Sequence, residues 1–397
     1  MARTRKTLAQ KIDTAHLISV GVLASICPRE LIDEVLAKTG KASQRDRLLP
    51  APAVVYYVMA LALWREAPLE EVLRVVCEGL QWLSGGKAGA VQASKSAISQ
   101  ARTRLGPEVM KQLADRVLRP LARPGAPGGW YRGWRLMAVD GSCMDVADET
   151  ANAEHFGYPG ASRGQSAFPQ ARVLGLVECG THVVVAASIA PYKTSEVAMA
   201  AELLPLKLTG EMLLMADRNF YSFKLWQKAS TARLLWRVKS NLLLPVQQPL
   251  ADGSYLSTVF DSKDQARKNG QTVRVIDYTL KDSATPVQSS YRLLTNILEP
   301  EAAPALELAA LYHERWEIES VFDEFKTHMR SASTVLRSKT PELVQQELWG
   351  LLLAHFAIRQ LMEQAAWTQQ LDPDRLSFTN ALRVIKRKMP QAAALPP

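Results

Sequence analysis

Short apolar runs and amphipathic segments alternate between residues 135 and 239, and their order is compatible with few folds. The strand-like runs are apolar and bounded by turn residues, and the helical ones repeat their apolar positions every three to four residues. In order, they predict strands at 135–140, 172–178 and 182–190, a helix at 195–208, a strand at 212–217, a helix at 222–230 and a strand at 233–239. The turn CGT makes the second and third strands a β-hairpin. This order predicts a mixed α/β sheet flanked by helices.

Two of these runs end in an aspartate. RLMAVD ends at Asp140, and EMLLMAD ends at Asp217. Ligands of open α/β sheets gather beyond the carboxyl ends of the strands, so both carboxylates are candidates for one site. An aspartate at the end of a strand is also a common turn or cap residue, and each one alone is open to that interpretation.

A third carboxylate lies on a helical segment, LYHERWEIESVFDEFKTHMR, at residues 311–330. At about 100° per residue, Tyr312, Arg315 and Lys326 fall within about 40° of Glu319 around the helix axis. One side of the helix therefore carries a carboxylate, two cations and a phenol, while a separate stripe is apolar. The alternative is an ordinary surface helix stabilised by ion pairs between its own residues.

Three carboxylates are the set needed to hold two divalent metal ions for in-line attack on a phosphodiester. With them, the chain resembles the DDE transposases of the insertion-sequence-4 type. The family signature Y-x2-R-x3-E-x6-K is matched by Tyr312, Arg315, Glu319 and Lys326, and its first two acidic positions by Asp140 in VDGS and Asp217 in MADRNFYS. The resemblance covers about residues 15–390.

The resemblance implies a ribonuclease-H-like catalytic core. It also implies a β-strand insertion within the 101 residues between Asp217 and Glu319. Asp140, Asp217 and Glu319 would bind two Mg²⁺ (or Mn²⁺) ions. Arg315 and Lys326 would hold DNA phosphates, and Tyr312 would hydrogen-bond another phosphate or pack its ring locally. The implied activity is cleavage of transposon ends and their joining to target DNA.

Four consecutive regions are expected. They are a helical N-terminal DNA-binding region (1–128), the first part of the catalytic core (129–239), a β-rich insertion (240–300), and the second part of the core with C-terminal helices (301–397). In the first region, a helix after Ser94 presents Lys95, Arg102 and Arg104 to DNA, or is a plain surface helix. The long apolar helix that begins at Thr340-Pro341 is expected to pack against the sheet.

The formal net charge of +9 and the pI near 9.3 favour an anionic partner, here double-stranded DNA at transposon ends and target. Four cysteines without a CxxC pair indicate reduced thiols in a cytosolic protein, and no membrane segment is expected. The expected location is the bacterial cytoplasm, in association with the nucleoid. A homodimer on DNA is implied by the family. The rival functions are a ribonuclease-H-like nuclease without joining activity and a non-catalytic DNA-binding regulator.

Overall fold

A computed structural model of the chain describes residues 20–43, 45, 47–83, 93–161, 164–280, 289–329 and 335–391. The chain forms two compact units. The sheet unit consists of residues 120–143 and 172–322, and the helical unit consists of residues 1–119, 144–171 and 323–397. Each unit is therefore assembled from segments that are far apart in the sequence.

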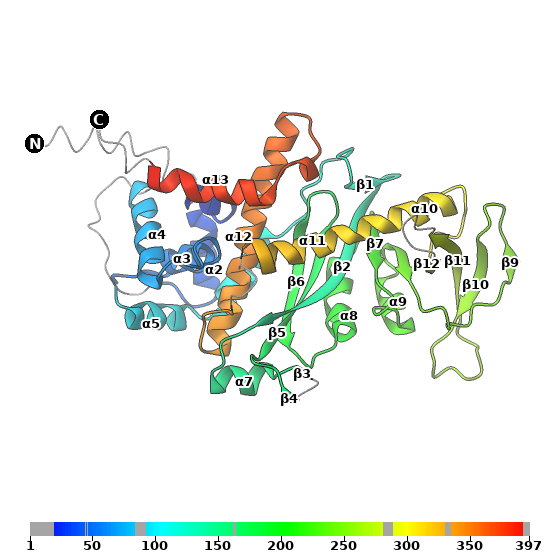
Figure 1. Ribbon diagram of the computed structural model, residues 1–397, viewed down its shortest axis with the longest axis horizontal. Helices are drawn as coiled ribbons and strands as arrows, with labels where there is room; N and C mark the ends of the chain where they lie inside the picture. The colour runs from blue at the N-terminus through cyan, green and yellow to red at the C-terminus, as the bar shows by residue number, and fades with distance from the viewer. Residues whose placement is uncertain are drawn as a thin grey trace, which may run out of the picture. The chain divides into compact units, whose positions relative to one another are not determined.

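One mixed sheet organises the sheet unit, with strands in the order β6-β5-β2-β7-β8-β12-β11-β10-β9 and β1 paired with β2 (Figure 1). The strands are β1 (Trp130–Tyr131), β2 (Trp134–Asp145), β5 (Gln170–Glu178), β6 (Val183–Pro191), β7 (Met212–Ala216), β8 (Arg233–Arg237), β9 (Gln248–Pro249), β10 (Tyr255–Val259), β11 (Gln271–Leu280) and β12 (Ser289–Thr295). The predicted order of strands and helices between residues 135 and 239 is confirmed, as is the mixed α/β class.

The centre of the sheet is parallel, because β7 pairs in parallel with both β2 and β8. Leu213, Leu214 and Met215 of β7 are completely buried. A strand enclosed on both faces needs an uninterrupted apolar run, and this is why MLLMA forms the middle of the sheet. One boundary differs from expectation, since β2 continues past Asp140 to Asp145 where a strand ending at Asp140 was predicted.

Two helices of the sheet unit begin at serine caps. The hydroxyl of Ser195 accepts a hydrogen bond from the amide of Ala198 at the start of α8 (Glu196–Lys207). Ser222 does the same for α9 (Phe223–Ala229). On α9, Trp226 packs edge-on against Trp236 of β8 at 5.3 Å between ring centroids, and both side chains are fully buried. The caps thus fix where each helix starts, and the tryptophans fix how α9 meets the sheet.

The β-rich residues expected between 240 and 300 extend the same sheet. β12 pairs antiparallel with β8, and β11 pairs antiparallel with both β12 and β10. After β12, the chain enters α10 (Ala305–Leu311), a 3₁₀ turn η1 (Tyr312–Trp316) and α11 (Glu317–Asp323). The insertion is therefore hydrogen-bonded to the core sheet through the pairing of β12 with β8.

Helices form most of the helical unit. Its elements are α2 (Arg29–Lys38), α3 (Ala51–Leu63), α4 (Leu69–Leu83), α5 (Lys95–Leu105), α6 (Pro107–Val117), α7 (Thr150–Phe156), a small hairpin β3 (Gly160–Ala161) with β4 (Gly164–Gln165), η2 (Glu324–His328), α12 (Pro341–Thr368), η3 (Pro373–Arg375) and α13 (Phe378–Gln391). Helix α3 is apolar on all sides and buried along nearly its whole length, as such a helix must be.

Helix α12 corrects one expectation. It packs mainly against α3 and α6 of the helical unit, where packing on the sheet was predicted. Gly350 permits this approach, because a Cβ atom there would lie 2.7 Å from the carbonyl oxygen of Val58 on α3. A helix that is apolar on all sides offers no stripe that distinguishes a sheet from other helices as its partner.

Two buried carboxylates tie α12 to its surroundings. Glu347 accepts hydrogen bonds from the Ser338 amide at 3.1 Å and from the Ser338 hydroxyl at 2.6 Å. Glu324 of η2 is bound by His355 at 2.7 Å and by Arg359. Burial opposes ionisation of Glu324, but the bonds to His355 and Arg359 outweigh it, so the pKa of Glu324 is lowered.

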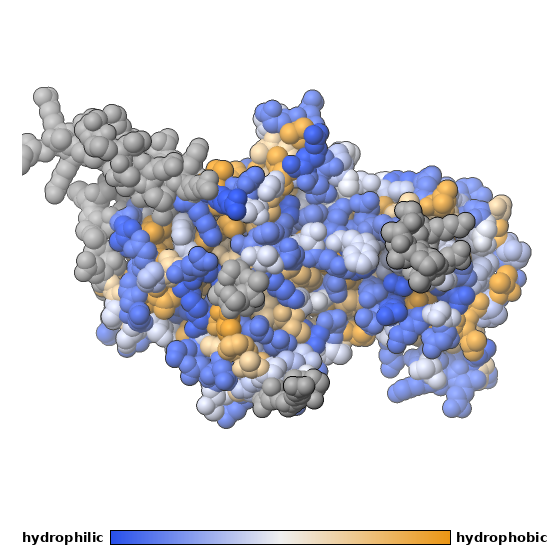
Figure 2. Space-filling view, in the orientation of Figure 1, coloured by the Kyte–Doolittle hydropathy of each residue, from blue (hydrophilic) through white to orange (hydrophobic). Residues whose placement is uncertain are grey.

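No disulfide joins any of the four cysteines, all of which lie in the described part of the chain. Among the described helices, none is long and apolar enough to cross a membrane. Polar residues cover most of the face shown in Figure 2, and apolar residues form separate patches on it.

Candidate active site

The first two carboxylates lie side by side in the sheet unit. Strands β2 and β7 are in parallel register, with Val139 opposite Ala216, and the next residues are Asp140 and Asp217. Neighbouring strands of a sheet are about 4.8 Å apart, so the register brings these two aspartates next to each other. The position is the carboxyl end of β7, where ligands of such sheets bind.

The segment that carries the third carboxylate is helical throughout, but its winding changes. Tyr312 and Arg315 lie in the 3₁₀ turn η1, where residues three apart are eclipsed. Glu319 lies one α-helical turn after Arg315, in α11. The expected row of Tyr312, Arg315 and Glu319 therefore exists along one side. A single regular helix was predicted, whereas the structure has a 3₁₀ turn within it.

Tyr312 joins this segment to the sheet. Its hydroxyl donates a hydrogen bond to the carbonyl oxygen of Ala216 at 3.3 Å, and the residue is only 2% exposed. Ala216 immediately precedes Asp217, so the contact fixes the helical segment beside the second carboxylate. This arrangement is the local packing and donation that the sequence left open for Tyr312, and it uses the hydroxyl that a phosphate contact would need.

Arg315 is the cation of the site. Its Nη2 lies 3.4 Å from Glu319 Oε1, and the guanidinium lies over the rings of Tyr312 and Trp316. Burial opposes the charge of Arg315, but Tyr312 and the carboxylates of Asp217, Asp140 and Glu319 outweigh it and raise its pKa. One guanidinium thus interacts with all three predicted acidic residues. Among the described residues, none accepts a hydrogen bond from its buried Nε.

Asp140 is the most perturbed carboxylate of the site. Burial, together with the nearby Glu196 and Asp217, raises its pKa to about 6, although the Gly141 amide and Arg315 act in the opposite direction. Crowding negative charge in a poorly solvated place costs free energy in the absence of a cation. That cost is a feature of sites built to bind cations.

Oxygen ligands of this kind suit divalent metal ions such as Mg²⁺. Asp140 and Asp217 are adjacent hard donors, and Glu319 is half-exposed on the helical segment with its carboxylate turned to Arg315. Within the described part of the chain, the three do not form a cluster with all ligand oxygens within 4.8 Å. These oxygen donors fit a divalent ion chemically. Asp140 and Asp217 already lie next to each other, and Glu319 is held by Arg315.

Comparisons with known proteins agree with this geometry. Residues 17–115 match the family described as insertion element 4 transposase N-terminal, and residues 132–357 match the transposase DDE domain. The chain belongs to the DDE transposases of the insertion-sequence-4 family. It is a DNA transposase, an enzyme of the DDE class.

Two curated relatives come from Escherichia coli strain K12. The transposase InsG for insertion sequence element IS4 is 30% identical over 373 residues, which cover 91% of this chain and 80% of InsG. The putative transposase InsZ is 25% identical over 290 residues, which cover 68% of this chain and 94% of InsZ.

In this transposase, Lys326 belongs to the helical unit. It is exposed and lies in η2, a π-helical turn that follows α11. A π turn adds a residue to the helical repeat, so the 100° spacing used for Lys326 in the sequence does not hold there. Its proximity to the three carboxylates remains a prediction.

The basic helix α5 divides into exposed and buried cations. Lys95 and Arg104 are exposed, and Arg104 lines a surface hollow together with Lys41 and Arg47. Arg102 corrects the prediction of a DNA contact. It is 6% exposed, and its guanidinium donates to Ser338 at 3.0 Å and to the carbonyl of Leu343 at 2.8 Å. Burial and these contacts account for Arg102 as a structural residue of the helical unit.

One residue of the site was missed in the sequence. A Cβ atom at Gly141 would lie 2.5 Å from Glu196 Cδ, so the Glu196 carboxylate lies directly over the backbone next to Asp140. Arg172 pairs with Glu196 and also donates to the carbonyl of Tyr192. Glu196 follows a serine cap at the start of a helix, where acidic residues are ordinary, so no sequence signal singled it out.

Asp145 and Asp148 were possible alternative ligands. The carboxylate of Asp145 accepts a hydrogen bond from Gln170 at 2.8 Å, and that of Asp148 accepts one from Tyr158 at 2.6 Å. Both contacts are local to the helical unit, and they give Asp145, the last residue of β2, and Asp148, in the loop that follows, structural roles.

Proposed function

We propose that Asp140, Asp217 and Glu319 are the metal ligands and catalytic carboxylates of this transposase, and that they bind two Mg²⁺ (or Mn²⁺) ions. The observation that carries the proposal is the register of β2 and β7, which makes Asp140 and Asp217 neighbours. Arg315 supports it, because this cation interacts with all three acids. The family supports it too, since a DDE domain implies divalent metal ions.

When bound, divalent ions would activate a water or a DNA 3′-hydroxyl and stabilise the leaving oxygen. In the first reaction, water oxygen bonds to the phosphorus at a transposon end, and the bond from phosphorus to the 3′ oxygen breaks. In the second, the liberated 3′-hydroxyl oxygen bonds to a phosphorus of target DNA, and the bond from that phosphorus to the 3′ oxygen of the target strand breaks. Asp140, Asp217 and Glu319 hold the reacting centre in place, and no side chain becomes covalently attached to DNA.

Arg315 has a second task in this proposal. Its guanidinium is paired with Glu319, and its Nε has no acceptor among the described residues. With metal bound to Glu319, the planar guanidinium is available for a phosphate next to the scissile bond. Lys326 would contribute a point charge that binds a phosphate of the same DNA strand. Tyr312, by contrast, acts through its bond to Ala216 and orients the helical segment.

Partners follow from the reaction. The substrate is double-stranded DNA, both transposon ends and target, and the net charge of +9 favours it. Lys95 and Arg104 of α5 would contact its backbone, with Lys41 and Arg47 extending the basic surface. Joining two ends to one target calls for a homodimer on the DNA. We assign the protein to the bacterial cytoplasm, in association with the nucleoid.

The test uses the DNA that flanks this gene, because it contains the end sequences. Wild type, Glu319→Gln and Glu314→Gln are compared for Mg²⁺-dependent cleavage and for joining of an oligonucleotide with a 3′-hydroxyl end. Glu314 is an exposed glutamate five residues earlier in the same segment and serves as the matched control. Loss of both reactions in Glu319→Gln alone supports the proposal. Equal activity of the two variants contradicts it, and cleavage without joining by wild type indicates a simple nuclease.

A further inference from the structure

Helix α10, which leads into the catalytic helical segment, has no cap of its own. The residue before its first turn is Pro304, which has no side chain able to accept a hydrogen bond. The carboxylate of Asp252 takes that role from another element, because its Oδ2 accepts a hydrogen bond from the Ala305 amide at 2.8 Å. A carboxylate at this position satisfies an unpaired amide and opposes the positive end of the helix dipole. Asp252 lies in the turn between β9 and β10 of the insertion.

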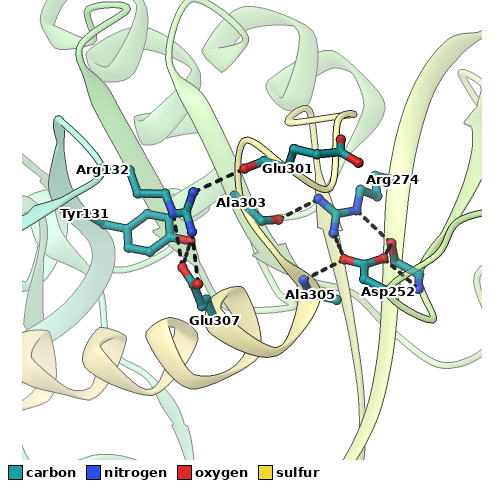
Figure 3. A network of polar contacts seen from close by, with 9 residues as sticks. Tyr131, Arg132, Asp252, Arg274, Glu301, Ala303, Ala305 and Glu307 are labelled. Atoms are coloured by element: carbon teal, nitrogen blue, oxygen red, sulfur yellow. Dashed lines mark hydrogen bonds and ion pairs between the residues drawn. The ribbon is translucent and has the colours of Figure 1, made fainter.

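Asp252 is in turn held by Arg274 of β11 (Figure 3). Arg274 is completely buried, and its remaining donors reach the Ser254 hydroxyl at 2.8 Å and the carbonyl oxygen of Ala303 at 2.7 Å. The guanidinium therefore joins a turn of the insertion directly to Ala303, before Pro304, and through Asp252 to Ala305, after it. A buried arginine needs such a set of acceptors, so the arrangement has few alternatives.

The other side of α10 is tied to the core. Glu307 accepts hydrogen bonds from the hydroxyl of Tyr131, the last residue of β1, at 2.6 Å and from Nε of Arg132, in the turn between β1 and β2, at 3.1 Å. Arg132 also donates to the carbonyl of Glu301 at 3.1 Å. Figure 3 shows α10 between these two groups of contacts. Its first turn is thus fixed from the insertion and from the core at once.

The position of α10 affects the position of Glu319, because the chain is helical without a break from Ala305 to Glu319. Helical segments are stiff over this length, so a shift at the first turn moves the residues that follow it. We propose that Asp252 and Arg274 are positioning residues for catalysis, which set the place of Glu319 through α10. The inference rests on the proposed role of Glu319. It gives the β-insertion a task in the active site in addition to any contact with DNA.

The test compares matched substitutions within the β-insertion. Asp252→Asn weakens the contact with α10, because it removes the negative charge and replaces one of the two acceptor oxygens with an amide donor. Arg274→Lys keeps the positive charge but loses the planar fork that holds Asp252 and Ala303. Asp277→Asn and Arg292→Lys serve as controls, because Asp277 and Arg292 form an ion pair between β11 and β12. Full-length proteins are measured for single-turnover cleavage at saturating end DNA, for DNA affinity, and for hydrogen exchange of backbone amides 305–319.

Asp252→Asn and Arg274→Lys are expected to lower the cleavage rate about 10- to 100-fold, as small misplacements of catalytic groups do. DNA affinity stays within about twofold, and amides of 305–319 exchange faster. The half-saturating Mg²⁺ concentration rises, which a smaller folded fraction would not cause. The controls match wild type in every measurement.

Two results would overturn the inference. One is cleavage by Asp252→Asn and Arg274→Lys equal to that of the controls. The other is a loss of rate with unchanged exchange at 305–319. Should one variant fail to fold, the other decides by the same measurements. Glu319→Gln is included, since its activity would contradict the proposed function itself, whereas an inactive Glu319→Gln beside an active Asp252→Asn contradicts only the positioning role.

Discussion

The Tyr312 hydroxyl lies 3.3 Å from the carbonyl oxygen of Ala216, the last residue of β7 and the neighbour of Asp217. The helical segment that carries Glu319 is therefore hydrogen-bonded to the strand that Asp217 follows. The tyrosine of the sequence signature makes a structural contact here.

Removing that hydroxyl tests the assignment. Tyr312→Phe is expected to lower the free energy of unfolding by about 0.5–1.5 kcal/mol, since it deletes one buried hydrogen bond. Cleavage at saturating DNA falls by up to about tenfold, and DNA affinity is unchanged. Urea unfolding and fluorescence-anisotropy binding measure the two effects. Weaker DNA binding with unaltered stability would instead assign the hydroxyl to a phosphate.

The raised pKa of Asp140 predicts a dependence of stability on pH. The folded protein keeps the proton of Asp140 up to about pH 6, whereas the unfolded chain releases it near the ordinary value of 3.8. Stability therefore falls as pH rises between these values, and the cost persists above pH 6. Without metal, Asp140→Asn should be more stable than wild type by about 1–3 kcal/mol at pH 7.5 and by almost nothing at pH 3.5.

Thermal unfolding with a metal chelator measures this difference. Addition of Mg²⁺ is expected to stabilise wild type and to leave Asp140→Asn unchanged. A variant less stable than wild type at pH 7.5 would show that the ionised carboxylate is stabilised by its surroundings, contrary to the argument from burial.

Gly180, in the turn between β5 and β6, has no room for a side chain. Its φ is +77°, and a Cβ atom would lie 2.6 Å from the carbonyl carbon of Gly128. Gly180→Ala should cost more than about 2 kcal/mol in unfolding free energy, by strain and by displacement of backbone. Gly133→Ala is the control, since Gly133 has φ +87° and open space around it. It should cost about 1 kcal/mol, and equal losses in the two variants would show that backbone conformation alone matters.

Arg102 and Arg104 lie two residues apart on α5 and should respond oppositely to truncation. Arg102→Ala removes buried hydrogen bonds to Ser338 and Leu343 and should lower stability by about 2–4 kcal/mol. Arg104→Ala should leave stability unchanged, weaken binding of end DNA, and reduce the slope of log affinity against log salt by about 0.9. Binding titrations at several salt concentrations measure the slope. An unchanged slope would remove Arg104 from the DNA contacts.

The strands of the core were predictable because buried parallel strands must be apolar, and RLMAV and MLLMA are strong, short signals. The register of these strands could not be predicted from the sequence. The aspartate after each run nevertheless led to the expectation of a shared site. The family resemblance supplied the third acid, because Glu319 by itself fits an ordinary ion pair with Arg315.

What could not be predicted depended on contacts between distant residues. Arg102 and Arg104 have the same side chain on the same helix, and only the packing of α12 makes one of them buried. Glu196 meets Gly141 through the fold, across 54 intervening residues. The change of winding at Tyr312 was likewise invisible, since apolar periodicity over so few residues does not separate a 3₁₀ turn from an α-helix.

The pairing of β12 with β8 restricts how this enzyme can vary in length. Excising residues 240–300 would leave β8 with a row of unsatisfied amides and carbonyls, and an exposed strand edge promotes aggregation. Deletion of the outermost strands, β9 and β10, would only make β11 the new edge strand. Such a truncation would also remove Asp252. The end of the sheet at which deletions would otherwise be tolerated therefore contains the residue that caps α10. Insertions at the outer hairpins should therefore be accepted far more readily than losses.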